Sequence, residues 1–353
     1  MSRIRILIPV LVGVAVIAAA CSSSGDSSSD GDSREPAVVE GDPVGAEVAA
    51  EPSAGCDATP VVTPGEEEVT TTSGGDERWY LRQVPPAYDG TDPLPVVFDF
   101  HGYSEGARIH ATHSELGPYG DEQGFVTITP QGQGDIARWD TELGSTDLVF
   151  AGDLFDQVGE TLCVDENRFY VTGLSNGAFM TSAIACVYAD RIAAVAPVAG
   201  ISAIDGCDPS EAVPVVAFHG TGDDFVAYAG GLGEAALDLP APDGSGQTLR
   251  DIGAADSAEA QGPSVPEITA AWAERNDCDP DPTETIVADD VTLIEYECPG
   301  APVQLYRVTD GGHTWPGSAF SAGIEAVVGP TTMSISANEV MWEFFVAHPR
   351  QAS

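Results

Sequence analysis

The segment VTGLSNGAF, residues 171–179, places a serine between two glycines directly after an apolar run. The pattern Gly-x-Ser-x-Gly is typical of a sharp turn from a strand into a helix, which exposes the serine hydroxyl as a nucleophile. A polar turn that only requires small residues is the competing explanation. The apolar run 168–172 predicts a strand, and the Ala-, Met- and Ile-rich residues 176–188 predict a helix. This context favours the sharp turn, and we expect Ser175 to act as a nucleophile.

A serine hydroxyl is a weak nucleophile at neutral pH and needs a histidine as general base. Of the six histidines, His313 lies in the glycine-rich segment DGGHTWP, directly after the last predicted strand, 303–308. An α/β-hydrolase presents its base from that position. A loop histidine that binds only backbone groups is the alternative, and we assign the base to His313.

The base in turn needs an acid that selects its tautomer. We expect this acid after the predicted strand 214–218, where the sequence HGTGDDF contains Asp223 and Asp224. A loop aspartate often only binds N–H groups of its own turn. We assign the acid to Asp223 and keep Asp224 as the reserve. The order Ser, Asp, His along the chain is that of α/β-hydrolases and differs from the two other common serine protease orders.

Acyl transfer also requires N–H donors for the oxyanion that forms on the substrate. One donor is expected at Asn176, the residue after the serine, at the N-terminus of the predicted helix. The other is expected in the loop HGYSEG, residues 101–106, which follows the predicted strand 95–100. We assign it to the backbone N–H of Tyr103, with Gly102 as the neighbour that could replace it.

Two tryptophans are candidates for substrate binding. Trp139 follows the polar loop QGQGD after the predicted strand 124–129, and Trp315 lies beside the proposed base. Aromatic side chains at the rim of a cleft can bind an acyl or aryl group. Packing in the core is an equally good explanation for each of them.

The remaining histidines offer weaker signals. His101 and His219 each precede a glycine at the end of a predicted strand, and we expect them to brace loops. His110 and His113 have the His-x-x-His spacing that puts both rings on one face of a helix, but no acidic or cysteine ligand pattern follows them. We therefore predict no metal site.

Strands alternating with helices predict an α/β fold with a mostly parallel central sheet flanked by helices. Active groups collect at the carboxyl ends of the strands in such sheets. A strand pair is predicted within residues 66–84. The other predicted strands are 95–100, 124–129, 168–172, 192–198, 214–218 and 303–308, and the predicted helices are 147–163, 176–188 and 337–347.

Three regions are predicted along the chain. Residues 1–21 resemble a lipoprotein-type signal peptide, in which arginines precede 15 apolar residues and the segment AAAC ends at Cys21. Residues 22–55 are rich in Ser, Gly, Asp, Glu and Pro and predict a disordered acidic linker. Residues 56–350 predict the catalytic domain. We expect an extracellular protein that is anchored to the outer face of a bacterial membrane by a lipid on Cys21, with plain secretion as the alternative.

Charge excludes some partners. The chain has 13 basic residues, all arginine, and 56 acidic residues, for a formal charge of −43. Loss of residues 1–20 removes two arginines and no acid, which gives −45. We therefore expect no nucleic acid partner and no contact with an anionic lipid surface, apart from the lipid anchor.

Six cysteines remain when Cys21 carries lipid, and an even number in an exported protein predicts three disulfides. Fifteen pairings are possible. Only Cys278 with Cys298 is favoured, because a short apolar strand returns the chain between them. Residues 230–266, rich in Gly, Ala and Asp, either cap the cleft or form an inert surface insertion, and we favour the cap.

Six segments together resemble the bacterial polyhydroxybutyrate depolymerase and feruloyl esterase family of α/β-hydrolases over about residues 80–320. They are FHGYSEG, a Pro-Gln-Gly loop with a following tryptophan, CVDENRFYVTGLSNGA, RIAAVAPVAG, FHGTGDDFVAY and GGHTWPG. The resemblance implies the triad Ser175, Asp223 and His313, ester substrates and no cofactor. The family usually has Ala-Asp-Pro after His-Gly-Thr, whereas this chain has Gly-Asp-Asp, which leaves the acid ambiguous.

The sequence therefore predicts a secreted serine esterase whose substrate is a polyhydroxybutyrate-type polyester or its oligomers. A feruloyl or acetyl xylan esterase that acts on plant polysaccharide is the first alternative. An extracellular acyltransferase with the same triad is the second. A non-catalytic binding domain is disfavoured, because such a domain has no need to keep all three triad residues.

Overall fold

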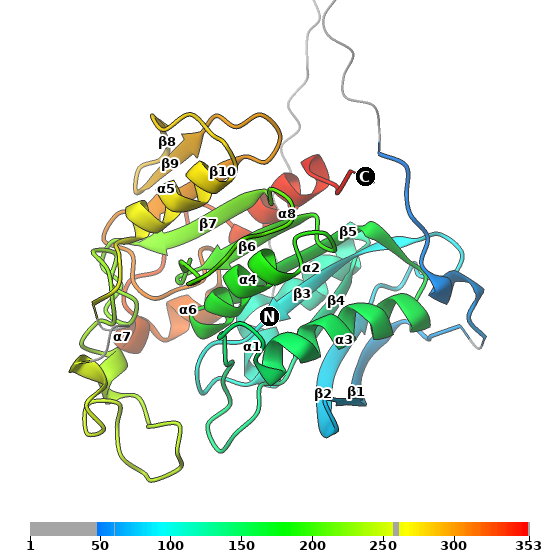
Figure 1. The fold of residues 1–353 in the computed structure, drawn as a ribbon, viewed down its shortest axis with the longest axis horizontal. Helices are drawn as coiled ribbons and strands as arrows, with labels where there is room; N and C mark the ends of the chain where they lie inside the picture. The colour runs from blue at the N-terminus through cyan, green and yellow to red at the C-terminus, as the bar shows by residue number, and fades with distance from the viewer. Residues whose placement is uncertain (1–47, 60, 257–260, 352–353) are drawn as a thin grey trace, which may run out of the picture. The chain divides into compact units, whose positions relative to one another are not determined.

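A ten-stranded sheet in the order β1-β2-β4-β3-β5-β6-β7-β10-β9-β8 forms the centre of the folded unit (Figure 1). The computed structural model describes residues 48–59, 61–256 and 261–351. The strands are β1 (Gly65–Ser73), β2 (Asp76–Val84), β3 (Leu94–Phe100), β4 (Val126–Pro130), β5 (Val164–Leu174), β6 (Ala194–Val198), β7 (Val215–Gly220), β8 (Thr283–Ala288), β9 (Val291–Tyr296) and β10 (Val303–Val308). The α-helices are α1 (Ala107–Ser114), α2 (Leu116–Gln123), α3 (Thr146–Thr161), α4 (Asn176–Val187), α5 (Val265–Arg275), α6 (Ala319–Gly323), α7 (Glu325–Val328) and α8 (Ala337–Ala347).

The six central strands, from β4 to β10 in this order, run parallel. Antiparallel strands extend both edges, with the β1–β2 hairpin on one side and β9 and β8 on the other (Figure 1). Parallel neighbours require a crossover connection, and helices supply most of these crossovers. The carboxyl ends of the six parallel strands therefore lie along one edge of the sheet.

Helices cover both faces of the sheet. Phe98 and Val171 pack in one apolar cluster together with residues of α3, α4 and α5. Their neighbours along the strands, Val97 and Tyr170, pack in a second cluster with residues of α2 and α8. Successive side chains of a strand point to opposite faces, so a strand with two covered faces is apolar at nearly every position. The predicted α/β fold with a mostly parallel sheet is thus confirmed.

The predicted elements occur close to their expected positions, and β10 and α8 coincide with the predicted ranges. The sequence analysis predicted no helix at α1 or α2. The α2 sequence LGPYGDEQ contains two glycines and a proline, which are poor helix formers, so tertiary packing overrides the local preference. Helix α5 was also missed, although Ser264 and Glu267 form a capping box at its start.

The boundary predicted between linker and domain is wrong by several residues. The Ser53 side chain is buried, and its hydroxyl donates to the Leu162 carbonyl at 2.7 Å and accepts the Val164 N–H at 3.1 Å. The Glu51 N–H donates to Asp165 at 2.9 Å. Residues that were expected to be disordered therefore belong to the folded unit. The predicted signal peptide and the linker up to residue 47 lie outside the described residues.

Three disulfides join Cys56 to Cys163, Cys186 to Cys207, and Cys278 to Cys298. The favoured pairing of Cys278 with Cys298 is confirmed, and the structure selects the other two from the possible arrangements. Such bonds persist in oxidising compartments, which agrees with an extracellular protein. In the described part of the chain, no helix combines the length and the apolar character needed to cross a bilayer.

The disulfides should differ in their effect on stability because they close loops of different length. Cys56 and Cys163 are 107 residues apart, whereas Cys278 and Cys298 are 20 residues apart. Paired Cys→Ser substitution should lower the free energy of unfolding by about 4.5 kcal/mol for the first and by about 3 kcal/mol for the second. Urea denaturation of both variants checks this order. A larger loss from the Cys278–Cys298 pair would contradict it.

Candidate active site

Ser175 sits at the corner where β5 ends and α4 begins. Its backbone has φ 57° and ψ −118°, and it is the residue immediately before the helix. A non-glycine residue with positive φ of this kind is strained by about 1–3 kcal/mol and persists only where the surroundings enforce it. The Ser175 N–H donates to the Val198 carbonyl at 2.9 Å, which ties the corner to the end of β6. This is the sharp turn that the Gly-x-Ser-x-Gly pattern predicts.

The two glycines of the pattern are required by close packing against β3. A Cβ on Gly177 would lie 1.9 Å from the Phe100 carbonyl oxygen. A Cβ on Gly173 would lie 2.5 Å from the same oxygen. Any larger residue would push the start of α4 away from β3. The glycines therefore allow the helix to approach the sheet closely enough to hold the strained serine.

His313 and Asp223 form a buried hydrogen-bonded pair. Nδ1 of His313 lies 2.8 Å from Oδ2 of Asp223, and both residues are buried. The other oxygen of Asp223 accepts the N–H groups of Phe225 and Val226 at 2.8 and 2.9 Å. A carboxylate accepts the proton on Nδ1, so Nε2 is the nitrogen that remains free to act as a base. Asp224 is exposed, and no hydrogen bond or ion pair joins it to His313 in the described part of the chain.

The charge state of Asp223 follows from its surroundings. Burial alone would raise the pKa of its carboxyl. The neighbouring His313, through its charge and its hydrogen bond, lowers the pKa of Asp223 below the ordinary value. The carboxylate therefore remains ionised at neutral pH and can stabilise a positive charge on the imidazole.

The sheet brings the three residues to one edge. Ser175 follows β5, Asp223 follows β7 and His313 follows β10, and these strands run parallel with only β6 between β5 and β7. Neighbouring strands are about 4.8 Å apart, so the loops that carry the three side chains start within about 15 Å of one another. Ser175 Oγ and His313 Nε2 have no hydrogen-bond partner among the described residues, and neither is one of the buried unpaired atoms. Neither atom is committed to a hydrogen bond with another described residue, so both remain available to react with a substrate.

The loop after β3 lies against Ser175. A Cβ on Gly102 would be 3.7 Å from the Cβ of Ser175. The Gly102 N–H is already used, because it donates to the Glu105 carboxylate at 2.8 Å. The N–H groups of Tyr103 and Asn176, in contrast, have no acceptor within the described ranges. Tyr103 is therefore a better candidate than Gly102 for the second oxyanion donor.

The two tryptophans do not line an open cleft, and their predicted role in substrate binding is corrected. Trp139 is 2% exposed and packs against Phe100 and His101, with ring centroids 5.1 and 4.8 Å away. Trp315 is 1% exposed, and its ring nitrogen donates to Asn338 at 2.9 Å. Rings buried to this degree offer no surface to a bound ester. The packing explanation accounts for both residues.

Trp139 instead holds the residue next to the serine. Its backbone N–H donates to the Asn176 side-chain oxygen at 2.7 Å, and its carbonyl accepts from the Asn176 side-chain nitrogen at 3.1 Å. The ring N–H of Trp139 donates to the His101 carbonyl at 2.9 Å. The loop after β4 is thereby attached both to α4 and to the loop after β3.

His101 and His219 contact loops as expected. Nε2 of His101 accepts the Gly132 N–H at 2.9 Å, and burial lowers the pKa of His101 to about 4, so its ring is neutral. Nε2 of His219 lies 2.9 Å from the Val226 carbonyl, within the loop that carries Asp223. Burial also lowers the pKa of His219.

The His-x-x-His pair is joined by an acid that precedes it. The Glu105 carboxylate contacts Nδ1 of His110 at 2.9 Å and Nδ1 of His113 at 2.7 Å. Ligand atoms of the three residues lie within 4.8 Å of one another. Glu105 lies five residues before His110, whereas a ligand pattern was expected only after the pair, so the His-x-x-His spacing alone did not reveal it. Nε2 of His110 also contacts Asp99 at 2.7 Å.

His110 lies between two carboxylates. Burial alone lowers the pKa of His110, but the charges of Asp99 and Glu105 and their hydrogen bonds outweigh it and raise the pKa to about 10. Both ring nitrogens face carboxylate oxygens, so both must carry protons. Burial alone raises the pKa of Glu105, and the two histidines lower it well below the ordinary range. The cluster therefore contains an imidazolium held between two carboxylates.

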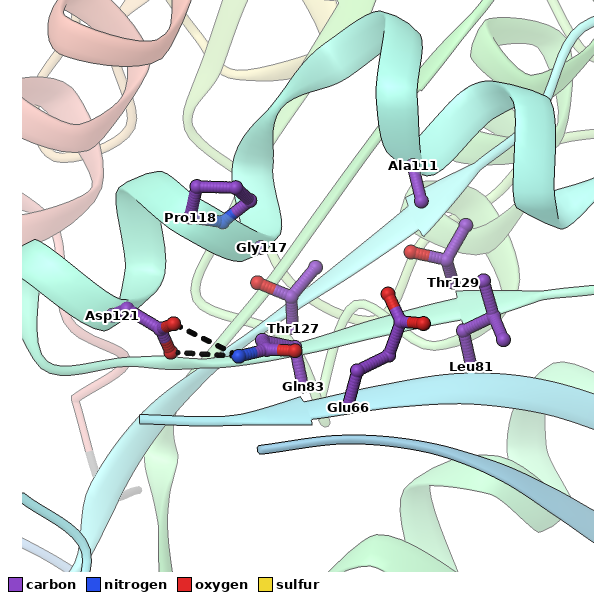
Figure 2. A pocket seen from close by; sticks show the side chains of 9 residues that line it. All are labelled: Glu66, Leu81, Gln83, Ala111, Gly117, Pro118, Asp121, Thr127 and Thr129. Atoms are coloured by element: carbon purple, nitrogen blue, oxygen red, sulfur yellow. Dashed lines mark hydrogen bonds between the residues drawn. The ribbon is translucent and has the colours of Figure 1, made fainter. Parts of the chain in front are cut away.

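A small cavity of about 110 Å³ lies between helices α1 and α2 and strands β1, β2 and β4 (Figure 2). It is lined by Glu66, Leu81, Gln83, Ala111, Gly117, Pro118, Asp121, Thr127 and Thr129. Gln83 donates to both oxygens of Asp121, one of the lining acids, at 3.0 and 2.9 Å. None of the proposed triad or oxyanion residues lines this cavity, so it takes no part in the site at the strand ends.

Comparison with solved structures decides the fold. An acetyl xylan esterase from Aspergillus awamori superposes with a TM-score of 0.53 over 80% of this chain and 99% of its own, at 15% sequence identity. The fold is that of the α/β-hydrolases. In this chain, Ser175 occupies the turn after a central parallel strand, and the Asp223–His313 pair lies at the ends of two strands farther along the sheet.

Sequence comparison finds esterases. Feruloyl esterase B of Piromyces equi is 26% identical over 246 residues, which cover 67% of this chain and 42% of that protein. Feruloyl esterase D of Neurospora crassa is 30% identical over 195 residues, 52% of this chain and 66% of its own. A bifunctional acetylxylan esterase/xylanase of Neocallimastix patriciarum is 28% identical over 134 residues, 38% of this chain and 20% of its own. The alignments thus span less than two thirds of the length of each of these relatives, and only a fifth of the third. No protein-family model matches the chain.

Substitution of each loop aspartate separates the two candidates for the acid. Asp223→Asn keeps an oxygen for the two backbone N–H groups but turns an amide N–H toward His313, which favours the wrong tautomer. Ester turnover should fall by roughly 10³- to 10⁴-fold. Asp224→Asn is the matched control and should retain activity within about twofold. Steady-state kinetics on p-nitrophenyl acetate check both, and loss in the control alone would assign the acid to Asp224.

The charged cluster at His110 should make stability depend on pH. The pKa of His110 is raised from 6.5 to about 10 in the folded state, so the folded protein binds this proton more tightly than the unfolded chain. The contribution is fully present below pH 6.5 and is lost as the pH rises through 10. Urea denaturation at pH 6, 8 and 10 should show this decline. His110→Gln should be less stable at pH 6 and should lose less stability between pH 6 and 10; an unchanged slope would contradict the assignment.

Proposed function

We propose that this chain is an extracellular serine carboxylic ester hydrolase that acts on feruloyl or acetyl esters of plant polysaccharides. The observation that carries the proposal is the buried Asp223–His313 pair at the same sheet edge as the strained Ser175. A hydroxyl, an imidazole and a carboxylate in this chain order are the three groups that acyl transfer through a serine requires.

The reaction follows from the chemistry of these groups. Ser175 Oγ attacks the ester carbonyl carbon while Nε2 of His313 takes the hydroxyl proton. Asp223 holds the imidazole through Nδ1 and stabilises its positive charge. The C–O bond to the alcohol then breaks, and His313 passes its proton to the leaving alkoxide. A water molecule, deprotonated by the same nitrogen, attacks the acyl-enzyme carbonyl. The bond between the acyl carbon and Ser175 Oγ breaks, His313 returns the proton to Oγ, and the acid leaves. Each step uses only side chains of this chain and water.

The oxyanion of the tetrahedral intermediate is assigned to the free N–H groups of Tyr103 and Asn176. The Asn176 N–H is at the start of α4, where the helix dipole adds to the stabilisation of negative charge. Loss of one such donor typically costs about 3 kcal/mol of transition-state stabilisation. The hydrogen bonds between Trp139 and the Asn176 side chain hold the start of α4 against the loop after β4.

The choice of substrate class rests on the relatives. The three proteins aligned above are feruloyl and acetylxylan esterases by name, and the superposed structure is an acetyl xylan esterase. They favour the alternative of the sequence analysis over a polyhydroxybutyrate-type polyester. Both classes present an ester carbonyl to the same triad, so the difference lies in the surface around it rather than in the reaction.

The segment 230–266 contributes to that surface. The Tyr103 hydroxyl donates to the Pro240 carbonyl at 2.8 Å, which attaches the segment to the loop of the proposed oxyanion donor. A Cβ on Gly244 would lie 2.4 Å from the Asp135 carboxylate, so the segment also touches the loop after β4. These contacts support the expectation that part of the segment covers the cleft.

The experiment compares three substrates and two variants. The purified wild-type protein should release ferulate from methyl ferulate or acetate from acetylated xylan, and it should release little 3-hydroxybutyrate from polyester film. Ser175→Ala should lower turnover at least 10³-fold, because it removes the nucleophile. Product release is measured by liquid chromatography.

The exposed Ser210 offers a matched control, and Ser210→Ala should behave as the wild type. Full activity of Ser175→Ala would refute the proposed mechanism. Hydrolysis of the polyester film alone would keep the mechanism and overturn the substrate class.

A further inference from the structure

We propose that Glu105 is a positioning residue of this esterase: its carboxylate, held by His110 and His113, sets the loop that carries the oxyanion donor and connects it to the loop that carries the base. The inference rests on the proposed function and adds to it a residue that does not touch the substrate. It rests on a continuous set of hydrogen bonds. They link the loop after β3, helix α1, helix α6 and the loop after β10.

The first step is the contact between Glu105 and its own loop. Oε2 of Glu105 accepts the Gly102 N–H at 2.8 Å, and the Glu105 N–H donates to the Gly102 carbonyl at 3.2 Å. The two residues thus close a tight turn around Tyr103, whose N–H is left without an acceptor among the described residues. Gly102 lies against Ser175, so the shape of this turn determines where the Tyr103 N–H stands relative to the nucleophile.

The second step is what holds the carboxylate. Glu105 is 12% exposed at its side chain, and it accepts hydrogen bonds from His110 at 2.9 Å and from His113 at 2.7 Å. His110 is anchored in turn by Asp99, the next-to-last residue of β3, at 2.7 Å. The Ser114 hydroxyl donates to the second oxygen of Asp99 at 2.7 Å. The carboxylate is therefore fixed to the sheet through a charged, buried imidazolium, which leaves it little freedom to rotate.

The third step connects this cluster to the base. Nε2 of His113 lies 2.6 Å from the Ser321 hydroxyl, and that hydroxyl also accepts the Trp315 N–H at 3.0 Å. Trp315 is two residues after His313. The Ser318 hydroxyl donates to the His113 carbonyl at 2.7 Å, which makes a second link to the same loop. A path of direct hydrogen bonds therefore runs from Gly102 to Trp315. It connects the loop of the proposed oxyanion donor to the loop of the proposed base, whose relative positions matter for acyl transfer.

The same three side chains are of the types that bind zinc. In the structure, however, each nitrogen of His110 and each nitrogen of His113 has a hydrogen-bond partner at 2.6 to 2.9 Å. Direct contacts of this length between the two rings and the carboxylate occupy the space that an ion between them would need. The three side chains therefore form a hydrogen-bonded network. Treatment with a metal chelator tests separately whether they bind a metal ion.

The test is Glu105→Gln, which keeps the shape of the side chain but presents an amide N–H to a histidine that also donates. The loop should lose its fixed shape, and kcat for p-nitrophenyl acetate should fall about 10- to 100-fold with KM changed less than about threefold. The exposed Glu122 of α2 provides the control, and Glu122→Gln should match the wild type.

A second substrate separates positioning of the oxyanion site from a general structural role. p-Nitrophenyl thionoacetate places sulfur where the ester has its carbonyl oxygen, and sulfur accepts hydrogen bonds poorly. The wild type should prefer the oxygen ester strongly, and Glu105→Gln should reduce this preference at least fivefold. An equal loss on both substrates, or no loss, would overturn the inference. A rate that EDTA abolishes and zinc restores would also overturn it, in favour of a metal site.

Ser321→Ala tests the far end of the path and guards against a Glu105 variant that does not fold. It should lower kcat on the oxygen ester about threefold and also reduce the preference over the thionoester. An unchanged preference in this variant would contradict the link to the base loop. Wild-type protein without any esterase turnover would refute the proposed function itself, whereas active wild type with unaltered variants would refute only the role of Glu105.

Discussion

The parallel alignment of β5, β6, β7 and β10 is the constraint on which the site depends. Because these strands run in one direction, their carboxyl ends lie along one edge, where Ser175 follows β5, Asp223 follows β7 and His313 follows β10. Helices cover both faces of the sheet, so the strands are held by burial on either side and do not slide. The hydrogen bond between His313 and Asp223 then needs only short loops from two neighbouring strands.

Around this rigid edge, the loops are held by polar contacts that are buried rather than by regular structure. His101 and Trp139 tie the loop after β3 to the loop after β4, and Trp139 also holds Asn176. Glu105 and the two histidines of α1 form the corresponding connection toward the base. Buried charges are costly unless they are paired, and here each carboxylate faces an imidazole or backbone N–H groups. Such networks give the loops one geometry, which is what an oxyanion site requires.

Much of the sheet was predictable because strands buried on both faces are continuous apolar runs, and the glycines around Ser175 mark the turn that follows one of them. The prediction failed where a side chain's surroundings decide its role. Trp139 and Trp315 are aromatic residues close in sequence to predicted site loops, which suggested that they line a cleft, but packing buries both side chains. Helix α2 forms against its propensity, and Ser53 joins the fold from a segment whose composition indicates a linker. Each of these outcomes depends on partners that are distant in the sequence.

The sequence by itself determined the parallel strands of the sheet, the turn that carries Ser175, and His313 with the two loop aspartates as candidates, since these follow from local periodicity and from glycine positions. It favoured Asp223 over Asp224 but could not exclude the second, because both lie in the same loop after a predicted strand. The tertiary structure decided between them by burying one carboxylate against His313 and leaving the other exposed. It also decided that Glu105 joins two histidines, since only folding of α1 against β3 brings their charges within hydrogen-bond distance.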